Sequence, residues 1–431
     1  MLTRLQAPPY EALAPHLPRG AAADPHVAAQ VRAILDDVRA RGDAAVREHT
    51  TRLDGVDLAP ERWEVSSDEQ WAAVERLPEA VHAALEASIE RVRAYHRKQL
   101  QPGFLAREDA SGLGMRVVPL ERVGVYVPGG KAAYPSTVVM TVVPAVVAGV
   151  SEIVVVTPPG GAQDAVIAAA RLAGAHRVYR IGGAQAIAAL AYGTATLPRV
   201  DKIVGPGNAY VTEAKRQVIG AVGIDMLAGP TEVLVLCDDT ADIRHVAADL
   251  IAQAEHDEDA SAWCVTTSAR IAEQLDAELE RQLATAPRRA IAEKALESHG
   301  VLVVVPSLDV AVNVANQRAP EHLELLIEDA WSVVERIRHA GAVFVGRFTP
   351  EPVGDYIAGP SHVLPTGGTA RYSSPLGVYD FVKRISVVGY SRGQLKADAD
   401  HITALAEAEG LAGHAEAIRL RIKNGVDSGS A

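Results

Sequence analysis

The chain has 431 residues, of which 48% are hydrophobic and 22% are charged, and its formal net charge is −12. This length predicts about two to four domains, and this composition is typical of a globular protein that stays in solution. The acidic balance argues against nucleic acid or an anionic membrane as a partner, because both bind basic surfaces.

The N-terminal part is predicted to be helical. From Pro25 to Gln101, Arg and Glu are interspersed among Ala, Val and Leu. The segment Asp68–Leu100 reads as one long helix that is broken or bent near Pro78, since proline removes a helix hydrogen bond. Pro102 and Gly103 then end the helical region.

From Met115 onward, short apolar runs alternate with helical segments. The expected strands are Met115–Pro119, Val123–Val127, Glu152–Thr157, Arg177–Ile181 and Lys202–Val204. The expected helices are Thr137–Ala148, Ala162–Ala173, Ala184–Tyr192 and Ala209–Ile219. Strands that alternate with helices of this length predict a parallel sheet covered on both faces.

The same pattern returns further along the chain. It returns after the strand expected at Glu232–Leu236, which closes the first unit, and its own strands are expected at Ala262–Thr266, Gly300–Val305, Leu323–Ile327 and Ala342–Val345. Its helices are expected at Ile243–Ala254, Ala269–Ala284, Leu308–Ala315 and Ala330–His339, and two tail helices at Gln394–Glu409 and His414–Lys423 precede a polar end, NGVDSGSA.

The sequence therefore predicts an α/β protein with two similar Rossmann-like parallel-sheet units. A helical N-terminal region (1–114) precedes the first α/β unit (115–236), the second unit (237–371) and a helical C-terminal tail (372–431). Ligands of such sheets bind at the carboxyl ends of the strands, so we expect a site between the two units.

Cysteine usage and apolar runs indicate a cytoplasmic protein. The two cysteines, Cys237 and Cys264, lie in strand-like runs, which favours buried, unreactive thiols over a disulfide framework. The N-terminus lacks the apolar core of a signal peptide, and the longest apolar run, Val138–Val150, is too short to span a bilayer.

Four glycine-rich turns follow predicted strands. They are YVPGGKAAYPS (Tyr126–Ser136), RIGGAQAIAAL (Arg180–Leu190), VGPGNAYV (Val204–Val211) and LAGPTEV (Leu227–Val233). Glycines let a backbone approach a ligand closely, and a helix start offers N–H groups to phosphate. None of the turns is the dinucleotide fingerprint G-x-G-x-x-G, and any α/β protein needs tight turns, so the pattern favours a nucleotide-sized ligand only modestly.

The stretch DLIAQAEHDED (Asp249–Asp259) presents a weak metal signal. Gln253 and His256 are three residues apart, so they lie on one face of the expected helix. An imidazole and an amide oxygen suit Zn²⁺ or a similar cation, although a polar helix end with a solvated acidic tail explains this stretch equally simply.

Two further stretches offer acid–base groups. In NQRAPEHLEL, Glu321 and His322 are a sensible general acid/base pair, but adjacent strand residues face one cavity only where the backbone is irregular. A surface Glu-His turn is the plain alternative. The long Gly/Pro-rich stretch Glu351–Phe381 is of a kind that is uncommon without a function, and it offers Asp355 and His362 as ligands or polar anchors.

Taken together, these stretches resemble the histidinol dehydrogenase family over essentially the whole chain. The resemblance rests on IDMLAGPTEVLV, DLIAQAEHDEDA, APEHLEL, GDYIAGPSHVLPTGGTARYSSPLGVYDF and the closing EGLAGHAEAIRLR. It implies a zinc- and NAD-dependent enzyme that ends histidine biosynthesis, with one Zn²⁺ per subunit. It also implies an intertwined homodimer whose C-terminal tail crosses to the partner.

The family's functional residues map onto this sequence individually. The implied metal ligands are Gln253, His256, Asp355 and His414, the last from the partner subunit, and the implied NAD contacts are Tyr126, Gln185 and Asn208. The implied substrate contacts are Thr231, Gln253, His256, His322, Asp355, Glu409 and His414. Thr231 replaces a common Ser and keeps the hydroxyl, whereas Ser361 replaces a commoner Asn.

The resemblance implies a four-electron oxidation of L-histidinol to L-histidine through histidinal, with two NAD⁺. In this hypothesis His322 removes the hydroxyl proton in the first oxidation, and Glu321 helps to activate water before the second. Three alternatives stay open: a same-fold zinc/NAD dehydrogenase for another small alcohol such as a sulfonated diol, a zinc hydrolase that uses Glu321, and a metal- or nucleotide-binding module without activity. The absence of H-E-x-x-H argues against the hydrolase.

Overall fold

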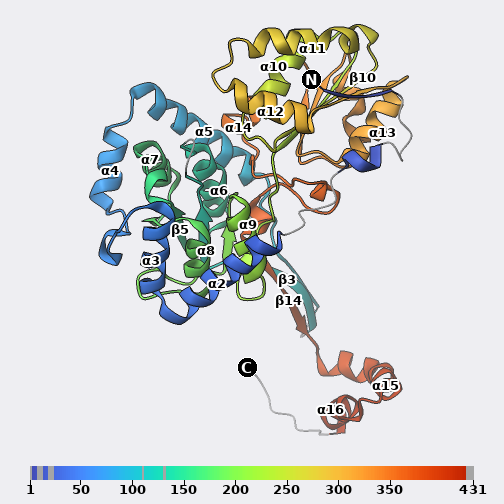
Figure 1. Cartoon of the computed structure of the whole chain (residues 1–431). Helices are drawn as coiled ribbons and strands as arrows, with labels where there is room; N and C mark the ends of the chain where they lie inside the picture. The colour runs from blue at the N-terminus through green and yellow to red at the C-terminus, as the bar shows by residue number, and fades with distance from the viewer. Residues whose placement is uncertain (1, 7–12, 18–23, 109–110, 130–132, 424–431) are drawn as a thin grey trace. The chain divides into compact units, whose positions relative to one another are not determined.

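The computed structural model describes residues 2–6, 13–17, 24–108, 111–129 and 133–423. It contains two parallel sheets and one small antiparallel sheet (Figure 1), so the predicted α/β class with two parallel-sheet units is confirmed. Within the described residues, no helix is both long enough and apolar enough to cross a membrane. The predicted polar end NGVDSGSA and part of the turn Tyr126–Ser136 lie outside these residues.

The first parallel sheet is built from continuous apolar runs, as expected for strands that are buried on both faces. Strand β5 reads EIVVVT and is buried from Ile153 to Thr157. The strand order is β6-β5-β4-β7-β8. The bounds are Arg177–Arg180, Glu152–Thr157, Arg122–Tyr126, Lys202–Val204 and Gly223–Ile224, in that order.

Helices cover both faces of this sheet. Val154 and Val156 face a core shared with one group of helices, so the alternate residues Ile153 and Val155 face the other group. The first group is α2 (Pro25–Arg41), α3 (Asp43–Asp54), α8 (Gly183–Tyr192) and α9 (Ala209–Val218). The second group is α4 (Ser67–Glu75), α5 (Glu79–Arg97), α6 (Pro135–Ala148) and α7 (Asp164–Ala173). The N-terminal helices therefore complete the layers of the first sheet.

The second parallel sheet has the order β1-β11-β10-β9-β12-β13. Its bounds are Thr3–Gln6, Val301–Val304, Ser261–Thr266, Glu232–Cys237, His322–Leu326 and Ala342–Val345. Helices α10 (Ile243–Ala254), α11 (Ala269–Leu283) and α12 (Arg289–His299) share one core with it. Helix α13 (Leu308–Arg318) and the 3-10 segment Ala330–Arg336 share the other, which contains the fully buried Trp263.

The chain divides into two compact units, and the smaller one comprises Leu100–Pro119 and Val382–Ala431. In this unit β2 (Phe104–Glu108) and β14 (Val382–Gly389) pair antiparallel with β3 (Ser111–Pro119). Helices α15 (Arg392–Ala408) and α16 (Ala412–Lys423) pack on each other. The larger unit comprises Met1–Gln99 and Leu120–Phe381 and contains both parallel sheets.

Several elements differ from the sequence-based expectation. Met115–Pro119, expected to open the first parallel unit, pairs antiparallel with β14 instead. Strand β9, expected at the end of the first unit, belongs to the second sheet, where it pairs with β10 and β12. Strands β1 and β14 and helix α12 were not expected, and the expected helix Ala330–His339 is a 3-10 segment that ends at Arg336.

Candidate active site

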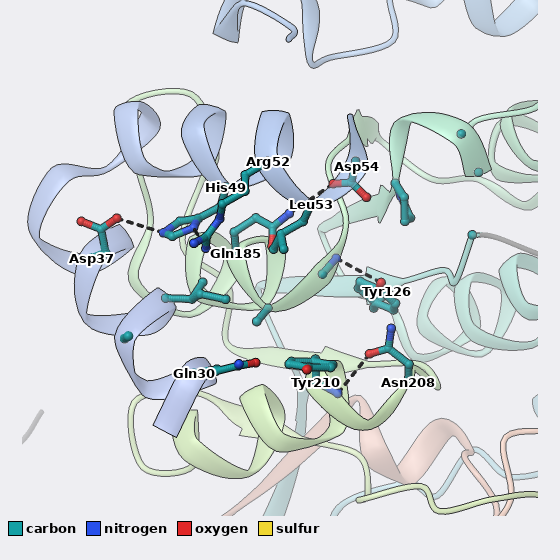
Figure 2. A pocket seen from close by; sticks show the side chains of 18 residues that line it. Gln30, Asp37, His49, Arg52, Leu53, Asp54, Tyr126, Gln185, Asn208 and Tyr210 are labelled. Carbon is teal, nitrogen blue, oxygen red and sulfur yellow. Dashed lines mark hydrogen bonds and ion pairs between the residues drawn. The ribbon is translucent and has the colours of Figure 1, made fainter. Parts of the chain in front are cut away.

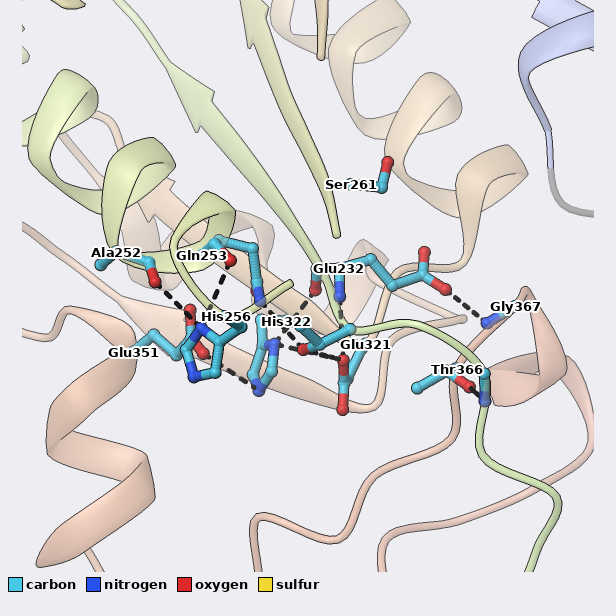
Figure 3. A network of polar contacts seen from close by, with 12 residues as sticks. Glu232, Ala252, Gln253, His256, Ser261, Glu321, His322, Glu351, Thr366 and Gly367 are labelled. Atoms are coloured by element: carbon cyan, nitrogen blue, oxygen red, sulfur yellow. Dashed lines mark hydrogen bonds and ion pairs between the residues drawn. The ribbon is translucent and has the colours of Figure 1, made fainter. Parts of the chain in front are cut away.

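Glu321 and His322 occupy the irregular backbone that their shared cavity requires. Helix α13 ends at Arg318, Ala319 has a left-handed φ of 48°, and β12 begins only at His322. Glu321 therefore lies in a turn before the strand, and its Oε2 is 3.7 Å from Nδ1 of His322. Both side chains are buried, so the surface-turn alternative is wrong. Figure 3 shows the two side chains within one network of polar contacts.

Glu321 is held by two donors from the segment that leads into β9. Its Oε2 accepts hydrogen bonds from Thr231 Oγ1 at 2.7 Å and from the main-chain N–H of Glu232 at 3.0 Å. Burial raises the pKa of Glu321 to about 7, against the opposing effects of His322 and these two donors. A carboxyl group of this kind exchanges protons near neutral pH, as a general base must.

The tautomer of His322 follows from its main-chain partner. Nδ1 lies 3.0 Å from the carbonyl oxygen of Glu232, so Nδ1 carries a proton and donates it. Nε2 is left as the basic nitrogen, 3.8 Å from Oε1 of Glu351. Burial lowers the pKa of His322, but the charges of Glu351, Glu321 and Asp355 outweigh it and raise the pKa to about 9.

Three groups with metal-ligating atoms meet beside this pair. Ligand atoms of His256, Glu351 and Asp355 all lie within 4.8 Å of one another. His256 Nδ1 donates to the carbonyl of Ala252 at 3.0 Å, which leaves Nε2 available as a ligand. Gln253 is adjacent, and its amide oxygen is buried without a hydrogen-bond partner among the described residues. An imidazole, carboxylates and an unpaired amide oxygen fit a divalent cation such as Zn²⁺.

Thr231 connects the metal group to the acid–base pair. Gln253 Nε2 donates to Thr231 Oγ1 at 2.9 Å, and the same hydroxyl donates to Glu321. Because the Thr231 hydroxyl gives its only proton to Glu321, it can only accept from Gln253, so this end of the amide is the nitrogen. The amide oxygen is therefore the end that stays available as a ligand. The hydroxyl keeps one lone pair for a substrate donor.

Sequence reasoning missed Glu351 and Glu324. Glu351 lies four residues before Asp355 on the short helix α14 (Glu351–Tyr356), so both side chains lie on one face of the helix. The signal in the sequence is this i, i+4 spacing in EPVGDY, which has meaning only if the segment is helical. Glu324 shares a strand face with His322 and is fully buried. Its Oε1 accepts the main-chain N–H of Glu351 at 2.7 Å, and its carboxyl hydrogen-bonds Asp249 of α10. Two carboxyl groups bond each other only when one is protonated.

The long stretch after Glu351 is anchored by Ser361, the position where relatives commonly have Asn. Ser361 is buried, donates to the carbonyl of Met140 at 3.1 Å and accepts the N–H of Val363 at 3.2 Å. This residue thus ties the stretch to helix α6. His362 is not in the metal group, and burial lowers its pKa.

The predicted NAD contacts line one cavity of about 870 Å³. Tyr126, Gln185 and Asn208 all border it, and Figure 2 shows them on neighbouring segments around the opening. Gln185 Nε2 donates to Asp54 at 3.3 Å, while its buried Oε1 has no hydrogen-bond partner among the described residues. Asn208 caps helix α9 through the N–H groups of Tyr210 and Val211.

The predicted NAD residues and the pair Glu321 and His322 lie at different edges of their sheets. The predicted NAD contacts lie at or after the ends of strands β4, β6 and β7, at the carboxyl edge of the first sheet. Glu232 and His322 begin β9 and β12, so Glu321 and His322 lie at the amino edge of the second sheet rather than at its carboxyl edge. A cavity of about 450 Å³ is bordered by Asn208 and by Leu227–Pro230, the residues just before Thr231 in the chain.

Glu409 and His414 belong to the smaller unit. Glu409 caps the C-terminus of α15, His414 lies in the first turn of α16, and both are exposed. Their role as substrate contacts, and that of His414 as a metal ligand, stay predictions.

Comparisons with known proteins cover nearly the whole chain. A family model described as Histidinol dehydrogenase matches residues 17–422. The histidinol dehydrogenase of Chromobacterium violaceum is 53% identical over 408 residues, 94% of each chain. That of a Synechococcus species is 51% identical over 400 residues, 92% of each chain. The crystal structure of histidinol dehydrogenase from Elizabethkingia anophelis superposes with a TM-score of 0.92 at 35% identity, covering 98% of each chain.

Proposed function

The chain belongs to the histidinol dehydrogenase family, and we propose that its acid–base pair and metal group together oxidise L-histidinol to L-histidine through histidinal. It is an NAD-dependent dehydrogenase of histidine biosynthesis. The observation that carries the assignment of the site is that His322 Nε2 faces Glu351 of the metal group while Nδ1 is held by the main chain.

His322 acts as the base of the first oxidation in this proposal. Its Nδ1–H is committed to the Glu232 carbonyl, so Nε2 accepts the hydroxyl proton of the substrate as NAD⁺ takes the hydride. The carboxylates that raise the His322 pKa to about 9 belong largely to the metal group. A divalent cation held by these carboxylates would offset part of their charge and would lower the pKa of His322, which favours the basic form of the imidazole.

Glu321 acts as the base of the second oxidation. With a pKa near 7 it is about half ionised at neutral pH, and it removes a proton from the water that hydrates the aldehyde. Its burial beside Thr231 limits access of other water, which protects a bound aldehyde between the two steps.

Gln253, His256 and Asp355, with the newly found Glu351, are the residues of this chain that would hold the metal. When bound there, Zn²⁺, which the family uses, would supply a Lewis acid for a substrate that carries an amine and an imidazole. Tyr126, Gln185 and Asn208 would hold NAD in the larger cavity, and Asn208 also borders the smaller cavity.

The homodimer is part of the same proposal, with Glu409 and His414 reaching the partner's site. The smaller unit supports this because it leaves apolar side chains uncovered: Leu105, Val388 and Leu405 are 56%, 69% and 67% exposed. A cytoplasmic location also belongs to the proposal, since the reaction consumes NAD.

The test of the function is the yield of NADH per L-histidinol consumed, before and after chelation. Two NADH per substrate, lost on chelation and restored by Zn²⁺, supports the four-electron reaction. We expect His322→Asn to abolish both oxidations, and Glu321→Gln to impair mainly the oxidation of added histidinal. A Glu321→Gln variant that oxidises histidinal at the normal rate would contradict this division.

The dimer is tested by mixing two inactive variants, His322→Asn and His414→Ala. If His414 acts across the interface, a random mixture regains about a quarter of the wild-type sites, because each mixed dimer has one site with both residues intact. If His414 acts within its own chain, the mixture stays inactive.

A further inference from the structure

Glu232 holds both members of the acid–base pair through its main chain. Its N–H donates to Glu321 Oε2 at 3.0 Å, and its carbonyl accepts from His322 Nδ1 at 3.0 Å. No other residue in the described part of the chain donates to one member and accepts from the other. A small shift of the Glu232 backbone therefore moves both reactive groups (Figure 3).

The side chain of Glu232 fixes that backbone in place. Its Oε2 lies 2.6 Å from Nη2 of Arg318, with both side chains almost fully buried, and its Oε1 accepts the N–H of Gly367 in a very short hydrogen bond. Arg318 also donates to Ser261 Oγ at 3.2 Å and stacks over Trp263, 5.1 Å from the ring centroid. Glu232 is thus clamped to two other segments of the fold.

The ion pair between Glu232 and Arg318 also lies next to the turn that leads to Glu321 and His322. Arg318 is the last residue of α13, three positions before Glu321, and the intervening backbone is the irregular turn at Ala319. On the other side of this turn, His322 is in register with Val233, next to Glu232. The turn is therefore held at one end by the ion pair and at the other by the strand.

Stability alone is a poor explanation for this pair. Buried ion pairs contribute little net stability, because desolvation of both charges offsets their attraction. In addition, Arg318 Nη1 makes no hydrogen bond with any described residue, and the only described partner of Glu232 Oε2 is Arg318 in the ion pair itself. An ion pair of this kind is better explained by holding neighbouring groups in position than by stabilising the fold.

We propose that the Glu232–Arg318 ion pair is a positioning device that holds the Glu321 carboxylate and the His322 imidazole in their reactive arrangement. This inference rests on the proposed roles of Glu321 and His322. It makes Glu232 and Arg318 positioning residues, because neither side chain reaches the metal group or the cofactor cavity.

The first test is Glu232→Gln, which keeps the size of the side chain but removes its charge. Because misplacement of reactive groups by about 1 Å can cost about 100-fold in rate, we expect kcat to fall about 10- to 100-fold. KM for NAD should stay within about threefold, and the zinc content should not change, because the cavity residues and the metal group are untouched. Arg318→Lys is the milder variant; it keeps the charge and the fold, and a smaller fall in kcat is expected.

The double variant Glu232→Gln/Arg318→Met distinguishes a loss of kcat caused by misplaced reactive groups from one caused by an unpaired buried charge. It removes the lone buried charge that Glu232→Gln leaves on Arg318, so its melting temperature should recover relative to Glu232→Gln. A positioning role predicts that kcat does not recover with it. Ile271→Val is the matched control: this fully buried residue of α11 lies in the core of the same sheet, and its truncation should lower the melting temperature and leave kcat unchanged.

The outcomes distinguish this inference from the proposed function. A wild-type kcat in Glu232→Gln, or recovery of kcat together with stability in the double variant, would overturn the positioning role. If His322→Asn also keeps its kcat, the proposed roles of the acid–base pair fail as well. If His322→Asn loses activity while Glu232→Gln keeps it, only the positioning inference is wrong.

Discussion

Thr231→Val should shift the pH dependence of the second oxidation to higher pH. The substitution keeps the branched shape of the side chain but removes the hydroxyl, which donates to Glu321 at 2.7 Å and accepts from Gln253 at 2.9 Å. Glu321 then keeps one donor, the N–H of Glu232. Loss of a donor to the carboxylate disfavours its charged form, so the pKa of Glu321 must rise.

The size of the shift follows from the hydrogen bond that is lost. A hydrogen bond to a charged group contributes about 1.5–3 kcal/mol, and about 1.4 kcal/mol corresponds to one pKa unit. The pKa of Glu321 therefore rises from about 7 by about one to two units. At pH 7 the ionised fraction falls from about a half to about a tenth or less, so histidinal oxidation slows about fivefold or more. At pH 9 about a half to nine tenths of Glu321 is ionised, so at least half of the rate should return.

The assay is the pH profile of kcat/KM for added histidinal, measured with Thr231→Val and with Thr231→Ser. The serine variant keeps the hydroxyl and should keep the wild-type profile. Zinc content is measured at each pH, because Gln253 loses its acceptor in the valine variant and a loss of metal would imitate the effect. If Thr231→Val keeps its full zinc content and its kcat/KM for histidinal falls at the same acidic pH as in the wild type, both the pKa argument and the role of Glu321 as base are refuted.

Three further predictions test other parts of the site. Gln185→Leu removes the unpartnered Oε1 from the large cavity, and we expect KM for NAD to rise about tenfold with little change in kcat at saturating NAD; an unchanged KM would exclude Gln185 from the cofactor site. Glu351→Gln should weaken zinc binding about 10- to 100-fold in a chelator competition, and wild-type affinity would show that Glu351 is not part of the metal site. Gly205→Ala places a Cβ 2.2 Å from the carbonyl oxygen of Tyr126 at a φ of +110°, so thermal unfolding should show a loss of about 1–3 kcal/mol or more.

The fold was largely predictable because most elements carry their own local signal. The strand EIVVVT and the helices that begin at Asn208 and Asp242 have apolar runs and capping residues that identify them in isolation. Strand β14 (Val382–Gly389) lacks such a signal, because its residues are mostly half-buried or exposed and its identity depends on pairing with β3. Strand β9 has a clear signal, but only pairing with β10 and β12 shows which sheet it joins.

The site was predictable only in part, for a related reason. Gln253 and His256 share a helix turn, so their proximity follows from spacing alone. Their proximity to Glu351 and His322 depends on how three segments meet, and no local pattern encodes that. The resemblance to a family supplied Asp355, but it did not identify Glu351 or the buried Glu324 behind it.

The chain connection between the two sheets explains why the reactive groups lie at an amino edge. Strand β8 ends at Ile224 and β9 begins at Glu232, so the short segment between them runs from one sheet to the amino edge of the next. This segment carries the glycine turn LAGPTEV and places Thr231 and Glu232 where Glu321 and His322 begin their strand. The cofactor cavity borders carboxyl ends of strands in the first sheet, while the smaller cavity reaches Leu227–Pro230. Because this segment enters β9 at its amino end, the residues proposed to react lie away from the carboxyl edge, where ligands of a single parallel sheet usually bind.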